Sequence, residues 1–513
     1  MQTNLIEKIK QQIVEFKEMT SKYYNKEISL KEYKGYSGGF GSYGERGGNS
    51  FMLRLRMNQG VLTKDKMKFI CDSINKYNVE KLHLTTCQTI QMHKLTPQSV
   101  GEIMEEALDH DIVCRGGGGD FPRNVMTSPL SGVNVNETFD VLPYAKACSD
   151  YLLSVMLDLH LPRKLKVAFE NDVNNPTHAT FRDLGFVAKS NGNFDVYCAG
   201  GLGQNPKMGV LVKEDALKED VLYYVRAMIL TFIENGNYEN RAKARTRYMQ
   251  DTLGIEGLKK AFNKNLEIAY KENLKINPQI IKINKKSNSE NTIKNWRVIK
   301  QKQEGLYTVM CHPIAGDISI EEFISLYNCI KDMDGVEIRI APDQNMYIIN
   351  LNANEALEVL EKTNFGAKNV FETSVSCVGA TVCQVGLRDF KGLLLKLVEG
   401  LRKYDFANGT LPRMHISCCP SSCGTHQIGL LGFRGSVKLV DKIPTPAFTM
   451  YVYGNDLLTK ERFGKELGTV CEDEILAMLV EIAKSVQANK TNFEDWYNNN
   501  EEVFNSIVSK YTA

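Results

Sequence analysis

The chain has 513 residues, of which 43% are hydrophobic and 24% are charged, and its formal net charge at pH 7 is +2. A chain of this length can form roughly two to four domains with buried cores. The near-neutral charge argues against binding of nucleic acid or of an anionic membrane. The N-terminus lacks the pattern of a secretory signal, and no apolar run approaches the ~20 residues of a membrane span, so we expect a cytoplasmic protein.

The first two predicted elements are a helix and a strand. Apolar residues near the N-terminus recur at helical spacing, namely at Ile6, Ile9, Ile13 and Phe16, which predicts an amphipathic helix. In the segment 51–57, apolar residues alternate with arginines from Leu53 to Met57. A strand there would turn Arg54 and Arg56 to one face and its apolar residues to the other.

The order of predicted elements occurs twice. A helix opening at 60–63 is followed by strands at 82–84 and 90–92, and a helix opening at 316–319 is followed by strands at 336–338 and 346–348. A second pair of segments agrees more closely, since Thr177-His178 precedes Leu184-Gly185-Phe186 and Thr425-His426 precedes Leu431-Gly432-Phe433. Short patterns can match by chance, but recurrence in the same order about 250 residues apart favours duplication of a whole unit.

Basic residues gather at three further places. Arg123 follows Pro122, and residues 161–167 alternate, which predicts a strand with Lys164 and Lys166 on one face. Residues 240–248 are also basic, and Arg241 and Arg245 lie four apart, so one helix face could present both. Taken singly, each basic segment is most simply explained as a solvated surface.

The chain has 13 cysteines, most of them single and in apolar contexts that are typical of buried thiols. Four fall in two pairs, with five residues between Cys377 and Cys383 and three between Cys419 and Cys423. Four thiolates suit a [4Fe–4S] cluster or a tetrahedral zinc ion. Zinc-binding cysteines usually lie closer together in sequence than the first pair, which favours the cluster. Cys418 is a fifth thiol, but only Cys419 gives the three-residue spacing.

The segments 373–383 and 414–424 resemble the cluster motifs of the assimilatory sulfite and nitrite reductases, which contain siroheme and a [4Fe–4S] cluster. The resemblance covers nearly the whole chain. It implies that Cys377, Cys383, Cys419 and Cys423 hold the cluster, and that Cys423 also binds the siroheme iron. It further implies an α+β fold with two pseudo-twofold related halves, each a ferredoxin-like half domain followed by a larger mixed sheet domain.

The domain boundaries implied by this resemblance follow the duplication. They are an N-terminal helical segment at 1–45, a first ferredoxin-like half domain at 46–110, a siroheme and anion-binding domain at 115–280, a linker at 281–303, a second half domain at 304–368 and a [4Fe–4S]/siroheme-binding domain with C-terminal helices at 369–513. Residues 474–486 carry a helical apolar stripe that agrees with the last of these.

The resemblance also assigns roles to the basic residues. The substrate-anion positions are Arg54, Arg123, Lys164 and Lys166, where cations would neutralise an oxyanion and polarise its bonds. The siroheme positions are Gln91, His93, Arg163, Asn240, Arg241, Arg245, Arg247, Gly200 and Gly201. His93 could equally be a structural histidine. The chain departs from the family at Cys87, where relatives carry an arginine that contacts siroheme.

We therefore expect an oxidoreductase that reduces sulfite to sulfide with six electrons. Sulfite is favoured because relatives acting on nitrite commonly carry asparagine where this chain has Lys166, and sulfite bears the larger negative charge. The alternatives are nitrite reduction to ammonia by the same cofactors, or a non-enzymatic siroheme-binding or metal-stapled structural protein.

The electron donor is expected to be a separate protein, because the chain shows no dinucleotide-binding fingerprint. A ferredoxin, or a flavoprotein or iron–sulfur subunit, would serve. A basic segment could dock an acidic donor, although such a segment is more often a solvated surface. Its residues are Lys282, Lys285, Lys286, Lys294, Arg297, Lys300 and Lys302.

Overall fold

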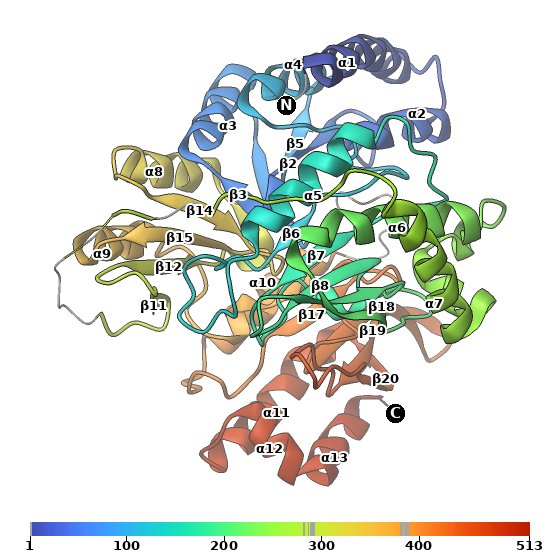
Figure 1. The fold of residues 1–513 in the computed structure, drawn as a ribbon. Coiled ribbons are helices and arrows are strands. Elements are labelled where there is room, and N and C mark those ends of the chain that lie inside the picture. Colours follow the sequence, from blue (N-terminus) through green and yellow to red (C-terminus); the bar gives the residue numbers. More distant parts are fainter. Residues whose placement is uncertain are drawn as a thin grey trace. The chain divides into compact units, whose positions relative to one another are not determined.

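The computed structural model describes residues 3–280, 283–285, 287, 293–379, 383 and 389–512 (Figure 1). The chain divides into two units. Unit 1 comprises Met1–Gly201, Pro206–Cys311 and Ile318–Asn364, and unit 2 comprises Leu202–Asn205, His312–Asp317 and Phe365–Ala513. Among the described helices, none has the length and apolar character needed to cross a membrane.

The predicted N-terminal helix is confirmed as α1 (Thr3–Tyr24). Its residues Ile9, Ile13 and Phe16 are buried, as their helical spacing predicts. The short helix α2 (Leu30–Ser37) follows, capped by the Ser29 side chain.

Two five-stranded sheets form the ferredoxin-like part of the fold (Figure 1). The first has the order β1 (Ser42–Gly44), β2 (Phe51–Arg56), β5 (Thr89–Leu95), β4 (Lys81–Leu84) and β13 (Asp317–Ile318). The second has the order β11 (Val298–Lys300), β12 (Tyr307–Cys311), β15 (Met346–Leu351), β14 (Glu337–Ile340) and β3 (Val61–Leu62). The helices of these halves are α3 (Lys64–Tyr77), α4 (Pro97–Glu106), α8 (Ile320–Ile330) and α9 (Ala353–Lys362).

The two halves exchange strands and hydrogen bonds reciprocally within unit 1. Strand β3 of the first half pairs with β14 of the second, with Leu62 opposite Ile338. Gln88 donates through Nε2 to the Ile340 carbonyl at 2.8 Å, and Gln344 donates to the Leu84 carbonyl at 3.4 Å. Both glutamines have a left-handed backbone, with φ of 53° and 66°. Such matched details are expected of a duplicated unit.

The larger sheets repeat one topology, one sheet in each unit. Unit 1 has the order β10 (Val210–Ala216), β9 (Phe194–Cys198), β8 (Leu184–Ala188), β7 (Val167–Glu170) and β6 (Met126–Thr127). Unit 2 has β16 (Val375–Ser376), β17 (Met414–Ser417), β18 (Leu431–Val440), β19 (Ile443–Val452) and β20 (Lys465–Cys471). In each sheet the first two pairings in chain order are parallel and the last two are antiparallel.

The repeated Thr-His and Leu-Gly-Phe segments have the same packing in both sheets. A Cβ atom on Gly185 would lie 1.9 Å from the Ala179 carbonyl oxygen, and one on Gly432 would lie 1.9 Å from that of His426. Only glycine allows this close approach of backbone. The duplicated α+β architecture predicted from the sequence is therefore confirmed.

Each large sheet has its own core. In unit 1, α5 (Leu142–Val155), α6 (Val221–Asn235) and α7 (Met249–Ala269) contribute buried side chains to a cluster that includes Phe169 and Phe186. In unit 2 the core helices are α10 (Phe390–Leu401), α11 (Ile475–Ala488), α12 (Phe493–Asn499) and α13 (Glu501–Thr512). Helix α11 confirms the apolar stripe predicted over 474–486.

The predicted strand over 161–167 is wrong in extent, because β7 begins only at Val167. Pro162 lacks the N–H that a ladder requires. Leu165 makes only an isolated bridge to Pro122. Lys164 and Lys166 nevertheless flank the buried Leu165 side chain, as their alternation suggested.

The predicted helix over 240–248 is also wrong. The segment forms two one-turn 3₁₀ helices, at Arg241–Lys243 and Thr246–Tyr248, and Arg245 between them is extended. The Asn240 side chain accepts a hydrogen bond from the Ala242 backbone and so competes with a continuous helix. Arg241 and Arg245 consequently do not share a helix face.

Candidate active site

Two of the predicted anion-binding arginines lie side by side in unit 1. Arg54 on β2 and Arg123 before β6 both donate through Nη1 to the Gly117 carbonyl, at 2.5 and 2.9 Å. Arg56, buried on the same strand as Arg54, donates to the carbonyls of Arg115 and Arg123. The shared carbonyl offsets part of the repulsion between the guanidinium groups, and Arg56 fixes the loop that carries Arg123.

A backbone hydrogen bond links the segment that carries Lys164 and Lys166 to the loop that carries Arg123. Arg123 N donates to the Leu165 carbonyl at 2.8 Å, between Lys164 and Lys166. The Lys166 ammonium donates to the Cys87 sulfur at 3.4 Å. Backbone pairing thus brings the lysine segment and the Arg123 loop together.

Cys87 lies where the predicted cations converge. The charges of Lys166, Arg182, Arg54 and Lys164 all act on its half-buried thiol. Burial acts to raise the pKa of Cys87, but these four cations lower it to about 6. A pKa of about 6 favours the thiolate form of Cys87 at neutral pH.

Two acidic residues orient other predicted cations. Asp120 accepts hydrogen bonds from Arg163 at 2.8 Å and from Arg241 at 2.7 and 3.1 Å. Although burial acts to raise the pKa of Asp120, Arg241 and Arg163 hold it below its ordinary value. Asp183, fully buried, accepts hydrogen bonds from Arg245 at 3.0 and 3.1 Å.

Asp120, Asp183 and Arg182 were not predicted from the sequence. Arg182 and Asp183 lie inside one copy of the repeated segment, directly before Leu184, so the repeat could have drawn attention to them. Asp120 carries no comparable signal, because a single carboxylate beside glycines matches many surface turns.

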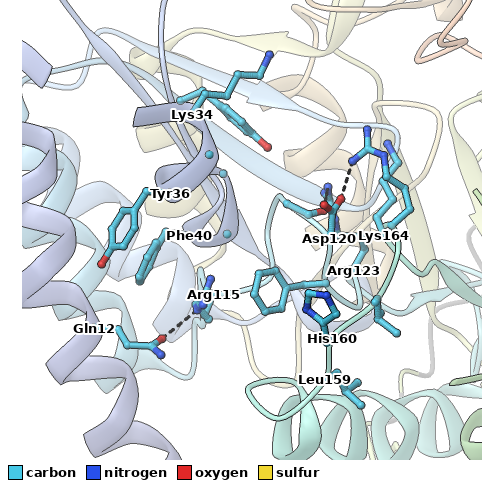
Figure 2. A pocket seen from close by; sticks show the side chains of 18 of the residues that line it. Gln12, Lys34, Tyr36, Phe40, Arg115, Asp120, Arg123, Leu159, His160 and Lys164 are labelled. Carbon is cyan, nitrogen blue, oxygen red and sulfur yellow. Dashed lines mark hydrogen bonds and ion pairs between the residues drawn. The ribbon is translucent and has the colours of Figure 1, made fainter. Parts of the chain in front are cut away.

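A cavity of about 770 Å³ opens beside these groups in unit 1 (Figure 2). Asp120, Arg123 and Lys164 lie together on one side of it, and Tyr36 and Phe40 lie on the other. Its cationic lining residues are Lys31, Lys34, Arg115, Arg123, Arg163, Lys164 and Arg241. A cavity of this size and charge can admit a small anion or the carboxylate of a larger group.

Several buried polar atoms of the described residues lack a hydrogen-bond partner within the chain. They include Nε of Arg123 and of Arg245, and Oε1 of Gln91. Buried polar groups are normally paired, so each such atom calls for an unseen partner. Two donors on cations and one acceptor fit a polar, anionic group such as siroheme, with its carboxylates.

Gln91 and His93 both lie buried on β5, as the predicted alternation requires. His93 Nδ1 is 2.8 Å from Glu45 Oε1, also buried, and this pair accounts for the histidine as a structural residue. A siroheme contact of His93 stays a prediction.

Gly201 lies close to two of the arginines that were predicted, like it, to bind siroheme. A Cβ atom on Gly201 would lie 3.7 Å from Arg247 Nη1 and 3.8 Å from Arg245 Nη2. Gly200 is constrained by the chain itself, since its Cβ would lie 2.7 Å from Phe181 Cα. The lack of a side chain at Gly200 thus serves packing, and contact of Gly200 with a cofactor stays a prediction.

The two cysteine motifs meet in unit 2 because they follow adjacent parallel strands. Val375 on β16 pairs with His415 on β17, so the carboxyl ends of both strands lie at one edge. Cys377 follows β16 directly, and Cys418 and Cys419 follow β17. Cys418 N donates to the Cys377 sulfur at 3.2 Å.

Four thiols lie together at this edge. The Cys418 thiol lies near those of Cys377, Cys383 and Cys419, while Cys423 is exposed. Within the described ranges, which omit 380–382 and 384–388, no three potential ligands are already arranged around a metal ion. The donor chemistry, a group of thiols on two converging segments, nevertheless fits a [4Fe–4S] cluster.

Three residues of the basic segment predicted to dock a donor are engaged within the chain. Arg297 is buried and donates to the carbonyls of Thr363 and Leu360 at 2.8 Å, so it is not available to a partner. Lys285 pairs with Glu355 at 2.6 Å, and Lys302 pairs with Glu137. Lys282 and Lys286 lie outside the described residues.

Comparison with known proteins decides between the reductase and the zinc protein. The model of the nitrite/sulfite reductase ferredoxin-like half domain matches residues 43–110, and that of the nitrite and sulphite reductase 4Fe-4S domain matches residues 118–270. The chain is thus similar to the nitrite and sulfite reductases over residues 43–110 and 118–270. It is therefore an oxidoreductase of the kind that carries siroheme and a [4Fe–4S] cluster.

Relatives named for either substrate are similar to this chain. Ferredoxin–nitrite reductase from Arabidopsis thaliana is 25% identical over 426 residues, covering 79% of this chain and 70% of the relative. A sulfite reductase (ferredoxin) from Mycolicibacterium paratuberculosis is 24% identical over 437 residues, covering 81% and 75%. The solved structure of Mycobacterium tuberculosis NirA shares the fold, with a TM-score of 0.77 at 21% identity over 93% of this chain and 92% of that one.

Proposed function

We propose that this protein catalyses the six-electron reduction of a small oxyanion, sulfite or nitrite, with electrons from a separate donor. The observation that carries the proposal is the convergence of Arg54, Lys164 and Lys166 on one position, with Arg123 joined to Arg54 through a shared carbonyl. Cations gathered in this way favour a bound anion, because each charge is partly removed from water.

In this proposal the four cations bind the oxyanion and hold its oxygens. Siroheme and the cluster, when bound, supply the electrons and the iron at which the anion is reduced. Positive charge around the anion lowers the cost of adding electrons to it. The ammonium groups of Lys164 and Lys166 can donate protons as oxygen leaves as water.

The proposed cofactor ligands follow the family motifs. Cys377, Cys383, Cys419 and Cys423 would hold the cluster, and Cys423 would also bind the siroheme iron. The siroheme carboxylates would be bound by Arg163, Arg241, Arg245 and Arg247. The unpartnered Nε of Arg245 supports such a partner.

Different observations support sulfite and nitrite as the substrate. The extra cation Lys166 favours sulfite, the more highly charged anion. Nitrite is supported by the similarity to ferredoxin–nitrite reductases of Arabidopsis thaliana and of Synechococcus elongatus, at 25% and 26% identity. The names of these relatives also support a ferredoxin as the donor.

The proposal is tested with the holoprotein and reduced viologen under anaerobic conditions. We expect about six electrons to be consumed for each sulfide or ammonia formed. Arg123→Ala should lower kcat/KM about 100-fold while siroheme content is unchanged. Lys213→Ala, at an exposed lysine on β10, is the matched control. A holoprotein with both cofactors and no turnover would instead support a siroheme-binding protein.

A further inference from the structure

Cys87 is held rigidly in the turn between β4 and β5. Its backbone N–H donates to Thr85 Oγ1 at 3.2 Å, and its carbonyl accepts from Asn124 Nδ2 at 3.1 Å. The next residue, Gln88, is fully buried and bonded at both ends of its amide, to Thr127 and to Ile340. The position of the thiol is therefore set by the fold.

The thiol contacts one cation directly and is surrounded by others. Lys166 Nζ lies 3.4 Å from the Cys87 sulfur. Arg54, Lys164 and Arg182 act on it from β2, from the segment before β7 and from the turn before β8, and Arg123 also interacts with it electrostatically. No carboxylate is among the groups whose charge acts most strongly on this thiol.

Other buried thiols of unit 1 show that burial alone does not have this effect. Burial raises the pKa of Cys114 to about 12, although Arg56 lies near enough to lower it in part. Burial also raises the pKa of Cys71 to about 12. Cys87 differs because several cations, including Lys166 in direct contact, stabilise its charged form.

We propose that Cys87 determines substrate specificity, because its thiolate offsets the charge of Lys166 and so favours nitrite over the more highly charged sulfite. This inference rests on the proposed oxyanion reduction and refines its substrate. With Lys166 paired to a thiolate, the site retains the charges of Arg54, Arg123 and Lys164. The thiolate also repels a dianion more strongly than a monoanion at the same distance.

The first test compares kcat/KM for sulfite and nitrite in the holoprotein. Cys87→Ser keeps the size of the side chain and removes its charge, so the ratio of sulfite to nitrite efficiency should rise about tenfold. Cys329→Ser, at a half-buried thiol on α8, should leave the ratio unchanged.

A double-mutant cycle isolates the pair. Lys166→Asn should change the ratio less than about threefold in the native background, because its charge is already offset. In the Cys87→Ser background the same change should lower the ratio about tenfold. Equal effects of Lys166→Asn in both backgrounds would show that Cys87 and Lys166 act independently, which overturns the proposal.

Protonation gives a second readout. As the pH rises through about 6 the thiolate forms, the net charge of the site falls by one, and nitrite should bind more weakly. Nitrite itself stays deprotonated over this range. The dissociation constant, followed by siroheme absorption, should rise with pH in the native protein and stay flat in Cys87→Ser. Identical pH profiles for the two proteins would contradict the proposal.

A readout without turnover separates the two hypotheses. The pH dependence of Cys87 alkylation by iodoacetamide, followed by mass spectrometry, should have its midpoint near 6 and move upward in Lys166→Asn. If this holds in a protein that reduces neither anion, only the proposed function fails. A midpoint at the ordinary thiol value would overturn the role of Cys87 whatever the activity.

Discussion

At the proposed oxyanion site, the net charge depends both on the cations and on the anionic groups that offset them. Asp183 is fully buried and accepts hydrogen bonds from Arg245, from the Thr246 hydroxyl and from the Lys166 backbone. The Cys87 thiolate acts to raise the pKa of Lys166. Burial and nearby arginines outweigh it, so the pKa of Lys166 lies below its ordinary value. The charge of each cation therefore depends on its partner.

Asp183→Asn tests how much the Asp183 carboxylate contributes to the stability of the fold around the cations. The change leaves Arg245 without a buried counter-charge, so we expect the free energy of unfolding to fall by about 3 kcal/mol. Urea denaturation measures it. Asp195→Asn, at a half-buried carboxylate on β9 that pairs with Lys189, is the control and should cost less than about 1 kcal/mol. Equal losses would mean that Asp183 is not a special anchor.

The cysteines give a second prediction at this scale. Cys418 contacts three of the proposed ligands, but family spacing assigns the ligand role to Cys419. We expect Cys418→Ser to retain four cluster irons per chain and Cys419→Ser to lose the cluster. Iron analysis and the visible spectrum of the anaerobic protein report the result. Loss of the cluster in Cys418→Ser alone would exchange the two roles.

At the scale of elements, the duplicated halves depend on reciprocal hydrogen bonds. The Gln88 amide hydrogen-bonds the backbone of Thr127 and of Ile340. Its removal would leave the Thr127 N–H and the carbonyls of both residues without partners. Gln88→Ala should therefore lower the free energy of unfolding by about 3 kcal/mol. Gln344→Ala should cost less, since its contacts are longer, at 3.3 and 3.4 Å. A larger loss for Gln344→Ala in urea unfolding would contradict this account.

The elements that could be predicted were those set by apolar periodicity. The N-terminal helix and the strand carrying Arg54 followed from apolar spacing, because burial selects one face. The duplication followed from segments that recur in the same order. The segment 240–248 could not be predicted, since asparagine side chains bond its backbone where the first one-turn helix begins. The role of Cys87 also lay beyond the sequence, which showed a missing arginine but not the five cations around the thiol.

For the whole molecule, the two kinds of chemistry reside in different units. Unit 1 carries the cations of the proposed oxyanion site, and unit 2 carries the cysteines proposed for the cluster. A duplicated fold explains this division, because each copy of the large sheet can keep its topology while its loops specialise. A reductase of this family needs both sets.

Cofactor analysis of the anaerobically purified chain tests the central claim most directly. About five irons per chain, siroheme absorption bands and oxidation of reduced viologen by nitrite or sulfite are the predicted result. A colourless protein that holds zinc at its cysteines and oxidises no viologen with either anion would contradict it.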